Sequence, residues 1–156
     1  MLAPPLASAM GIHKLFLNYG ITDQWIGVML VHLIPSVPYA VLTIMSSFSK
    51  LDVDLESQAR TLGATNSQVW LRITLPAIAP GIALAASLSF IISWSQYLLT
   101  LLTGGGRIVT LPIVLVGFEK SGDPAVAAGM ALILMLPPVL LFFIISFWMR
   151  ENRILD

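Results

Sequence analysis

The most informative stretch of the sequence is Ile73–Gly106, ITLPAIAPGIALAASLSFIISWSQYLLTLLTGGG. Its 34 residues lie between Arg72 and Arg107 and include no charged side chain. A helix needs roughly 20 predominantly apolar residues to cross a hydrocarbon core about 30 Å thick. This stretch is therefore long enough to cross a membrane, and it predicts a span at about 77–102.

Three other stretches carry the same signal along the chain. Residues 24–49 and 124–149 each hold 26 residues without a charge. The N-terminal stretch is shorter and contains His13 and Lys14, but the lysine is close enough to the end to reach the headgroups. It lacks a basic leader and opens with two prolines, which favours a span over a secretory signal. The predicted spans are about 2–19, 24–48, 77–102 and 124–149, with an outer loop at 103–123.

The composition agrees with a membrane protein and excludes several function classes. The chain is 57% hydrophobic and 10% charged, with no net charge, and its mean hydropathy is +0.90. A soluble domain of 156 residues could not bury so much apolar surface. A neutral chain is also a poor partner for nucleic acid, and a chain without cysteine has no disulfide or thiolate site. The fold class is predicted to be an all-α, polytopic membrane helix bundle with about four transmembrane helices.

The basic residues indicate the orientation of the bundle. With four spans, residues 50–75 and the C-terminal tail lie on one side and carry five of the eight basic residues. Lys14, Arg107 and Lys120 lie on the other side. The positive-inside rule then places the 50–75 loop and the C terminus in the cytoplasm.

The 50–75 loop carries helix signals of the kind found in soluble proteins. Asp52 can cap a helix whose apolar residues recur at Leu55, Ala59 and Leu62. Gly63 follows where a glycine commonly ends a helix in the left-handed conformation. These signals predict a short first helix and a glycine corner.

A second short helix is predicted after the corner. Thr65 and Gln68 have the spacing of a capping box, and the helix should end where the chain meets Leu75-Pro76. The loop is thus a cytoplasmic helix-turn-helix. From the pattern alone, docking into a partner and lying on the lipid headgroups are equally supported.

The loop resembles a known motif. Residues 55–64, LESQARTLGA, followed by Ile73-Thr74-Leu75-Pro76, are similar to the EAA loop of bacterial type I ABC importer permeases. That family pattern is E-A-A, three residues, G, nine residues, I-x-L-P, and Ser57 and Gln58 stand here at the glutamate and the first alanine. The resemblance implies a coupling helix that sits in a groove of the ATPase subunit. The coupling residues it implies are Glu56, Ser57, Ala59, Gly63, Ala64, Ile73, Leu75 and Pro76.

The resemblance covers nearly the whole chain. His32-Leu33-Ile34-Pro35 with Pro38-Tyr39, and the segment 93–98, SWSQYL, are similar to the spans before and after the loop in these permeases. Family members commonly have about six spans, so this chain is expected to be a fragment, a split subunit or a remnant. The partners implied are a cytoplasmic ABC ATPase, a second permease subunit or other half, and an extracytoplasmic solute-binding protein. Nucleic acid is not implied, and the location implied is the bacterial inner membrane.

Two polar stripes cross the predicted spans. In each, polar side chains recur at helical spacing, and polar side chains within a bilayer are unfavourable unless they are paired or functional. They could line a shared lumen, or they could bond backbone carbonyls and hold helices together. The candidate pathway residues are His32, Ser36, Tyr39, Ser89, Ser93 and Gln96, and the stripes also include Thr43 and Thr100.

The sequence gives no sign of catalysis, of a resident metal or of a cofactor. His13 and His32 are the only histidines, they lie on different predicted spans, and no carboxylate lies within a span to orient either. The leading hypothesis is a permease subunit, not itself an enzyme, that forms a translocation pathway and couples to a separate ATPase. The alternative is a truncated, non-transporting subunit with a binding or assembly role. An ion-coupled carrier would need an intramembrane carboxylate, and the predicted spans contain none, so this third alternative is disfavoured.

Overall fold

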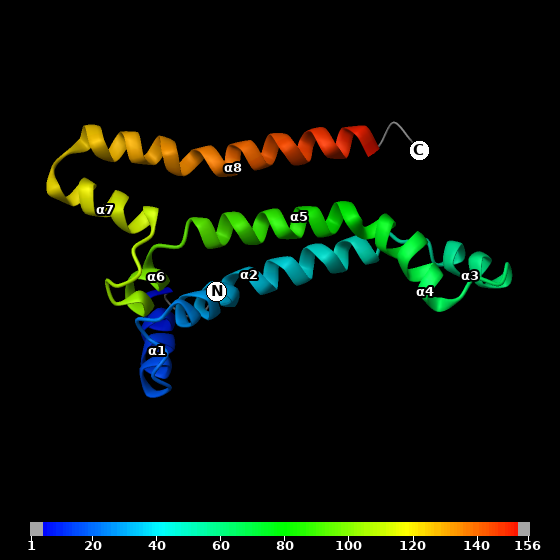
Figure 1. Ribbon diagram of the computed structural model, residues 1–156, viewed down its shortest axis with the longest axis horizontal. Coiled ribbons are helices and arrows are strands. Elements are labelled where there is room, and N and C mark those ends of the chain that lie inside the picture. The colour runs from blue at the N-terminus through cyan, green and yellow to red at the C-terminus, as the bar shows by residue number, and fades with distance from the viewer. Residues whose placement is uncertain (1–4, 153–156) are drawn as a thin grey trace.

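The computed structural model describes residues 5–152, and these residues form helices without any strand. In chain order the helices are α1 (Pro5–Asn18), α2 (Trp25–Phe48), α3 (Val53–Thr61), α4 (Asn66–Val69), the π-helix η1 (Trp70–Thr74), α5 (Leu75–Trp94), α6 (Leu98–Gly104), α7 (Leu111–Ser121) and α8 (Pro124–Asn152). Figure 1 shows α2, α5 and α8 running lengthwise, with α3 and α4 at one end and α1, α6 and α7 at the other. The predicted all-α membrane bundle is confirmed.

Three helices in the described part of the chain are long and apolar enough to cross a membrane. They are α2, the continuous helix Asn66–Trp94, and the part of α8 from Pro124 to Phe147. α8 runs back toward the end of the molecule that carries α3 and α4 (Figure 1). The end of α8 and the 50–75 loop therefore share one side of the bundle.

The stretch predicted as a fourth span folds as the shorter helix α1. Its 14 residues extend only about 21 Å, which is less than the roughly 30 Å of a hydrocarbon core. α1 also lies across the direction of the long helices (Figure 1). Residues 2–4 of the expected 2–19 span lie outside the described residues. Residues 5–152 contain three candidate spans, whereas four were expected.

The third expected span ends earlier than the apolar pattern indicated. α5 stops at Trp94, and residues 95–97 separate it from the short helix α6. The Ile91 carbonyl still accepts from the Ser95 N–H, whereas the Gln96 N–H turns to the Ser93 carbonyl. The Ile92 carbonyl, which would accept from the Gln96 N–H in a continuing helix, accepts instead from the Ser95 hydroxyl at 3.3 Å. The expected 77–102 span is thus α5 followed by a break and a separate helix.

The core of the bundle is the antiparallel contact between α2 and α5. Gly81 faces Ser47 of α2 in this contact, and Ile78 and Ala85 on α5 are buried as well. At Gly81 the two helices are so close that an added Cβ would meet the Ser47 side chain. Because Gly81 has no side chain, it permits this close approach of α2 and α5.

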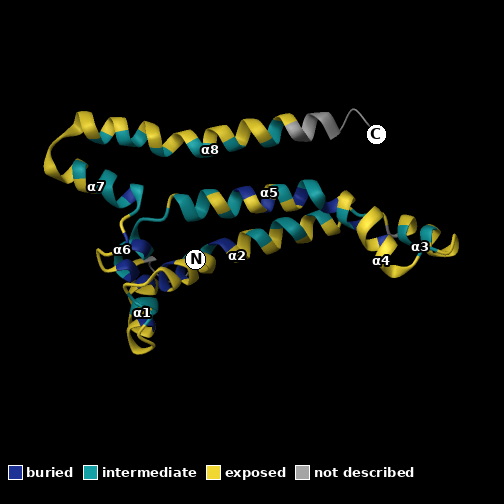
Figure 2. Cartoon of the chain, viewed as in Figure 1, coloured by how far each residue is buried: buried dark blue, intermediate teal, exposed yellow. Residues whose placement is uncertain are grey.

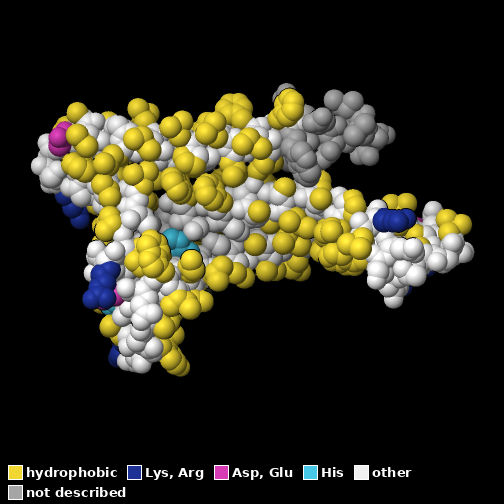
Figure 3. Space-filling model, viewed as in Figure 1, with side chains coloured by type: hydrophobic (Ala, Val, Ile, Leu, Met, Phe, Trp, Pro, Cys, Tyr) yellow, Lys and Arg dark blue, Asp and Glu magenta, His cyan; other side chains and the backbone are white. Residues whose placement is uncertain are grey.

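Most of the remaining apolar surface is exposed. Figure 2 shows α8 largely exposed along the described part of its length, and Figure 3 shows hydrophobic side chains covering the long helices while Lys and Arg gather toward the two ends of the molecule. This distribution suits helices that face lipid or other helices.

Candidate functional site

The first helix of the 50–75 loop begins as predicted. Asp52 is extended, and its side chain accepts a hydrogen bond from the Asp54 N–H at 2.9 Å. The carboxylate thereby satisfies one of the free N–H groups at the start of α3.

The corner after α3 is a left-handed glycine turn, as predicted. Gly63 has φ +88°, its N–H donates to the Arg60 carbonyl, and the Ala64 N–H donates to the Ala59 carbonyl, both at 3.0 Å. This pair of bonds is the Schellman arrangement that closes the end of a helix. An added Cβ on Gly63 would meet no atom within 4 Å, so the corner needs glycine for its backbone conformation and not for space.

The second helix starts with the predicted capping box but does not end where expected. The Thr65 hydroxyl accepts from the Gln68 N–H, and the Gln68 side chain accepts from the Thr65 N–H. The predicted stop at Leu75-Pro76 is wrong, because the helix continues from Asn66 to Trp94. Pro76 lacks an N–H and would crowd the carbonyl of Arg72, and the wider π-turn of η1 accommodates it, with the Leu75 N–H donating to the Trp70 carbonyl.

A side-chain bond that the motif did not predict joins the two halves of the loop. The Thr74 hydroxyl donates to the Glu56 carboxylate at 2.6 Å, and Thr74 is only 3% exposed. Glu56 therefore contacts η1. The bond holds α3 against the base of the continuous helix.

Apolar side chains on the loop remain uncovered. Leu62, beside the glycine corner, is 88% exposed, and Leu55, Trp70 and Leu71 are also exposed. We call residues 52–74 the docking hairpin, after the role that its resemblance to the EAA loop implies. Of the implied coupling residues, Ser57, Gly63 and Pro76 are exposed, whereas Glu56, Ala59, Ala64, Ile73 and Leu75 are half-buried.

The two polar stripes meet at His32. Its Nδ1 lies 2.8 Å from the Ser93 hydroxyl of α5, and its Nε2 lies 2.8 Å from the Thr100 hydroxyl of α6. Thr100 is fully buried and donates its own proton to the Gln96 carbonyl at 3.0 Å. Its oxygen must then accept from Nε2–H, which leaves Nδ1 to accept from Ser93. We call His32, Ser93 and Thr100 the histidine cluster.

The other candidate pathway residues are not part of this cluster. Ser36 donates to the His32 carbonyl, so its proton is used within α2. Tyr39 is 51% exposed, Ser89 is half-buried, and Gln96 lies in the break after α5. The structure thus brings together His32 and Ser93, and it adds Thr100, whose spacing in the second stripe was the only sequence signal for it.

A second long-range bond ties α5 to α8. The Trp94 indole N–H donates to the Leu134 carbonyl at 2.9 Å. Pro138 stands four residues after Leu134 and has no N–H to give to that carbonyl. Trp94 therefore supplies the hydrogen bond that the proline removes.

Among the residues that the structure describes, no group of three or more His, Cys, Asp or Glu side chains is placed to hold a metal ion. The candidate functional features of the described chain are therefore the docking hairpin, the histidine cluster and the Trp94 bond.

Three transport system permease proteins are similar to most of the chain. The trehalose transport system permease protein SugB of Mycobacterium tuberculosis is 32% identical over 81% of this chain and 47% of its own length. The sulfate transport system permease protein CysT of Salmonella typhimurium is 28% identical over 95% of this chain and 56% of its own. The spermidine/putrescine transport system permease protein PotC of Haemophilus influenzae is 25% identical over 98% and 60%. The chain thus spans about half the length of these relatives.

The family match covers almost the whole chain. Residues 1–151 match the family described as binding-protein-dependent transport system inner membrane component. This is a family of transport subunits and not of enzymes, and it agrees with the apolar helices and with the resemblance of the docking hairpin. The chain belongs to the family of ABC transporter permeases that form the inner-membrane component of binding-protein-dependent transport systems.

Proposed function

We propose that this chain contributes the translocation pathway of an ATP-driven importer and receives movement from a separate cytoplasmic ATPase through the docking hairpin. The observation that carries the proposal is the unbroken helix from Asn66 to Trp94, which joins the hairpin directly to a span. A displacement of the hairpin would be transmitted along a rigid element and not lost in a flexible loop.

The hairpin has the features of a docking element. The Schellman corner and the Glu56–Thr74 bond fix its shape, while Leu62 and Trp70 leave apolar surface exposed. A preformed shape with an exposed apolar anchor suits insertion into a groove on a partner protein. The implied coupling residues listed above are proposed to form or support this contact.

The pathway is proposed to lie along the polar faces of α2 and α5. The supporting observation is that the histidine cluster gathers uncharged polar groups inside an otherwise apolar bundle. Cysteines at Ser89 and Gln96 should react with a soluble thiol reagent in a nucleotide-dependent way, and cysteines at Leu140 and Phe143 should not. Equal inertness at all four positions would favour packing over a lumen.

The orientation proposed for the chain places the docking hairpin and the C terminus in the cytoplasm of a bacterium. Ser57 in α3 and Lys120 in α7 are both exposed and belong to opposite ends of the bundle. In intact cells a cysteine at Lys120 should react with an impermeant thiol reagent, and a cysteine at Ser57 should be protected. The reverse labelling would overturn the orientation.

The partners proposed are an ABC ATPase, a second permease subunit or the other half of the permease, and an extracytoplasmic solute-binding protein. The support is the family itself, whose description names binding-protein-dependent transport. The names of related permeases refer to trehalose, sulfate, molybdenum and spermidine or putrescine. Because a sugar, two inorganic nutrients and two polyamines are chemically different, the similarity selects no solute for this chain.

The test is affinity purification of the tagged chain from its own membranes in mild detergent. The proposal expects an ABC ATPase in the purified complex and solute uptake by vesicles that contain the complex. ATPase binding without any uptake would favour the alternative of an assembly role, and absence of the ATPase would contradict the docking assignment.

A further inference from the structure

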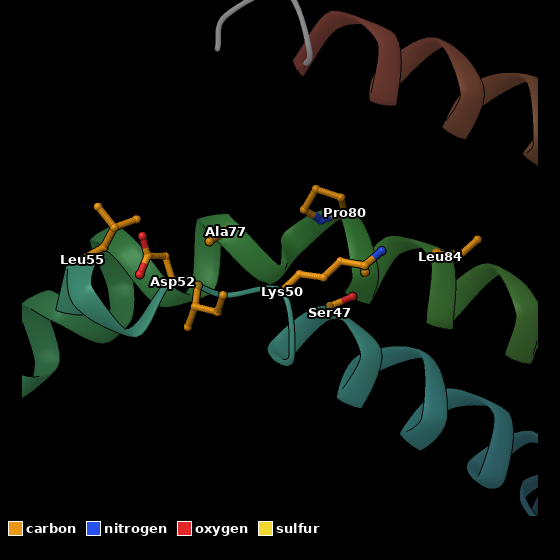
Figure 4. Close-up of a pocket in the computed structure, with 9 residues that line it drawn as sticks. Ser47, Lys50, Asp52, Leu55, Ala77, Pro80 and Leu84 are labelled. Atoms are coloured by element: carbon orange, nitrogen blue, oxygen red, sulfur yellow. The ribbon is translucent and has the colours of Figure 1, made fainter.

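A pocket of about 380 Å³ lies where the docking hairpin joins the spans. One wall comes from the end of α2 and the start of α3, and the other from the first turns of α5 (Figure 4). The lining residues are Ser47, Lys50, Leu51, Asp52, Leu55, Ala77, Pro80, Gly81 and Leu84.

Two charged side chains line the pocket, Lys50 and Asp52, and they differ in the hydrogen-bond donors that they present to a ligand. Asp52 accepts the Asp54 N–H with its Oδ1 at the start of α3, and as an ionised carboxylate it has no donor to offer an anionic ligand. Figure 4 shows the Lys50 side chain extended along α5, with its ammonium pointing away from Asp52. The Ser47 hydroxyl donates to the Thr43 carbonyl, so its proton is not free either. Lys50 therefore supplies the free donors of the pocket, and they are positively charged.

The position of the ammonium makes an anionic partner favourable. The α5 wall of the pocket belongs to the span Asn66–Trp94, and Leu84 continues onto the exposed apolar surface of that span. An ammonium beside an apolar wall at the end of a span is stabilised by a nearby negative charge. The matching ligand is amphipathic, with an anionic group beside Lys50 and a hydrocarbon chain along Pro80 and Leu84.

We infer that this pocket binds an anionic phospholipid of the inner leaflet, with its phosphate on Lys50 and the start of an acyl chain against α5. The leaflet follows from the orientation proposed above, on which the inference rests. A lipid in this place touches α3 through Leu55 and the span through Gly81, so it connects the docking hairpin to the helix that the hairpin moves.

The test measures which lipids remain bound to the purified full-length chain. The protein is purified in detergent with equal amounts of phosphatidylglycerol and phosphatidylcholine, and retained lipids are counted by native mass spectrometry. The wild type should retain phosphatidylglycerol preferentially, and Lys50→Gln should lower that preference about fivefold, as expected for one basic side chain at a membrane surface.

Two further variants separate the pocket from general surface charge. Arg60→Gln removes the same charge from an exposed position of α3 outside the pocket, and it should leave the preference unchanged. Ala77→Leu narrows the pocket without changing charge and should lower retention of the lipid. No preference in the wild type, an equal loss in Arg60→Gln, or undiminished retention in Ala77→Leu would overturn the inference.

Inorganic phosphate distinguishes a lipid from a free anion. An excess of phosphate should not displace the retained phosphatidylglycerol, because it cannot replace the acyl contacts, and complete displacement would contradict the assignment. Lipid retention requires neither ATPase nor solute, so failure here leaves the docking proposal standing. Conversely, a docking-defective Gly63→Val chain should retain the lipid normally.

Discussion

The docking hairpin and the histidine cluster are both held by hydrogen bonds, but the bonds span very different distances along the chain. In the hairpin, the Asp52 cap, the glycine corner and the Thr65 capping box join residues no more than five positions apart. In the cluster, His32 reaches partners 61 and 68 positions away. Local partners make the hairpin a self-contained shape, whereas the cluster exists only when α2, α5 and α6 are already packed.

Two glycines show the same contrast. Gly63 in the hairpin needs its positive φ and has open space around it, whereas Gly81 in the bundle needs the space and has an ordinary helical backbone. The hairpin is therefore sensitive to backbone conformation, and the bundle is sensitive to volume.

The largest effect should come from adding volume in the bundle. A Gly81→Ala change puts a Cβ against both the Oγ and the Cβ of Ser47, so α2 and α5 must separate. We expect a loss of about 3 kcal/mol in the free energy of unfolding, measured by denaturant titration in detergent.

The matched changes test whether volume is the cause. Gly129→Ala, in α8, adds the same methyl group to a span where nothing lies within 4 Å, and it should not destabilise. Ser47→Gly should rescue Gly81→Ala, and Ser47→Ala should not. If Gly81→Ala and Gly129→Ala had the same free energy of unfolding, the bundle would not be sensitive to added volume at Gly81.

A smaller loss should follow from breaking the bond between α5 and α8. Trp94→Phe keeps an aromatic ring but removes the indole N–H that donates to the Leu134 carbonyl. We expect a loss of about 1–2 kcal/mol in the free energy of unfolding, measured by the same titration. Pro138→Ala restores a backbone N–H for that carbonyl, so it should reduce the penalty of Trp94→Phe. A double variant no more stable than Trp94→Phe would show that the orphaned carbonyl is not the cause.

The smallest effect should appear in the hairpin itself. Glu56→Ala leaves the buried Thr74 hydroxyl without its acceptor, which should destabilise the hairpin by about 1 kcal/mol. Hydrogen exchange of the α3 amides should rise, while exchange in α2 stays unchanged. Glu56→Gln retains an acceptor oxygen and should behave nearly as the wild type. A similar rise in both variants would argue against the Glu56–Thr74 bond.

The sequence predicts the hairpin well because its signals are local. Asp52, Gly63 and Thr65 each act on a backbone group a few positions away, so spacing alone identifies the caps and the corner. The predicted stop at Pro76 is wrong because proline usually ends a helix, and a π-turn that accommodates it leaves no clear mark in composition.

The bundle is predicted less completely because its contacts are distant in sequence. Periodicity placed His32 and Ser93 on polar faces, but only packing shows that they meet, or that Thr100 joins them across the break after α5. The Trp94 bond depends on where Pro138 of another helix lies. The α5 end at Trp94 also has no proline or glycine to signal it.

The central claim is that the docking hairpin binds an ATPase through a shape that depends on Gly63. Gly63→Val should be strained at φ +88°, by roughly 1 kcal/mol or more for a β-branched residue, whereas asparagine tolerates this conformation. Since no neighbour lies within 4 Å, the two variants differ in conformational preference and not in clashes with surrounding atoms.

The deciding measurement is the amount of ABC ATPase that co-purifies with each molecule of permease in the wild type, Gly63→Val and Gly63→Asn. Our account predicts that Gly63→Val reaches the membrane at the normal level but loses the ATPase, while Gly63→Asn retains most of it. Normal ATPase binding by Gly63→Val, or an equal loss in both variants, would contradict the claim that the left-handed corner of the hairpin is what docks.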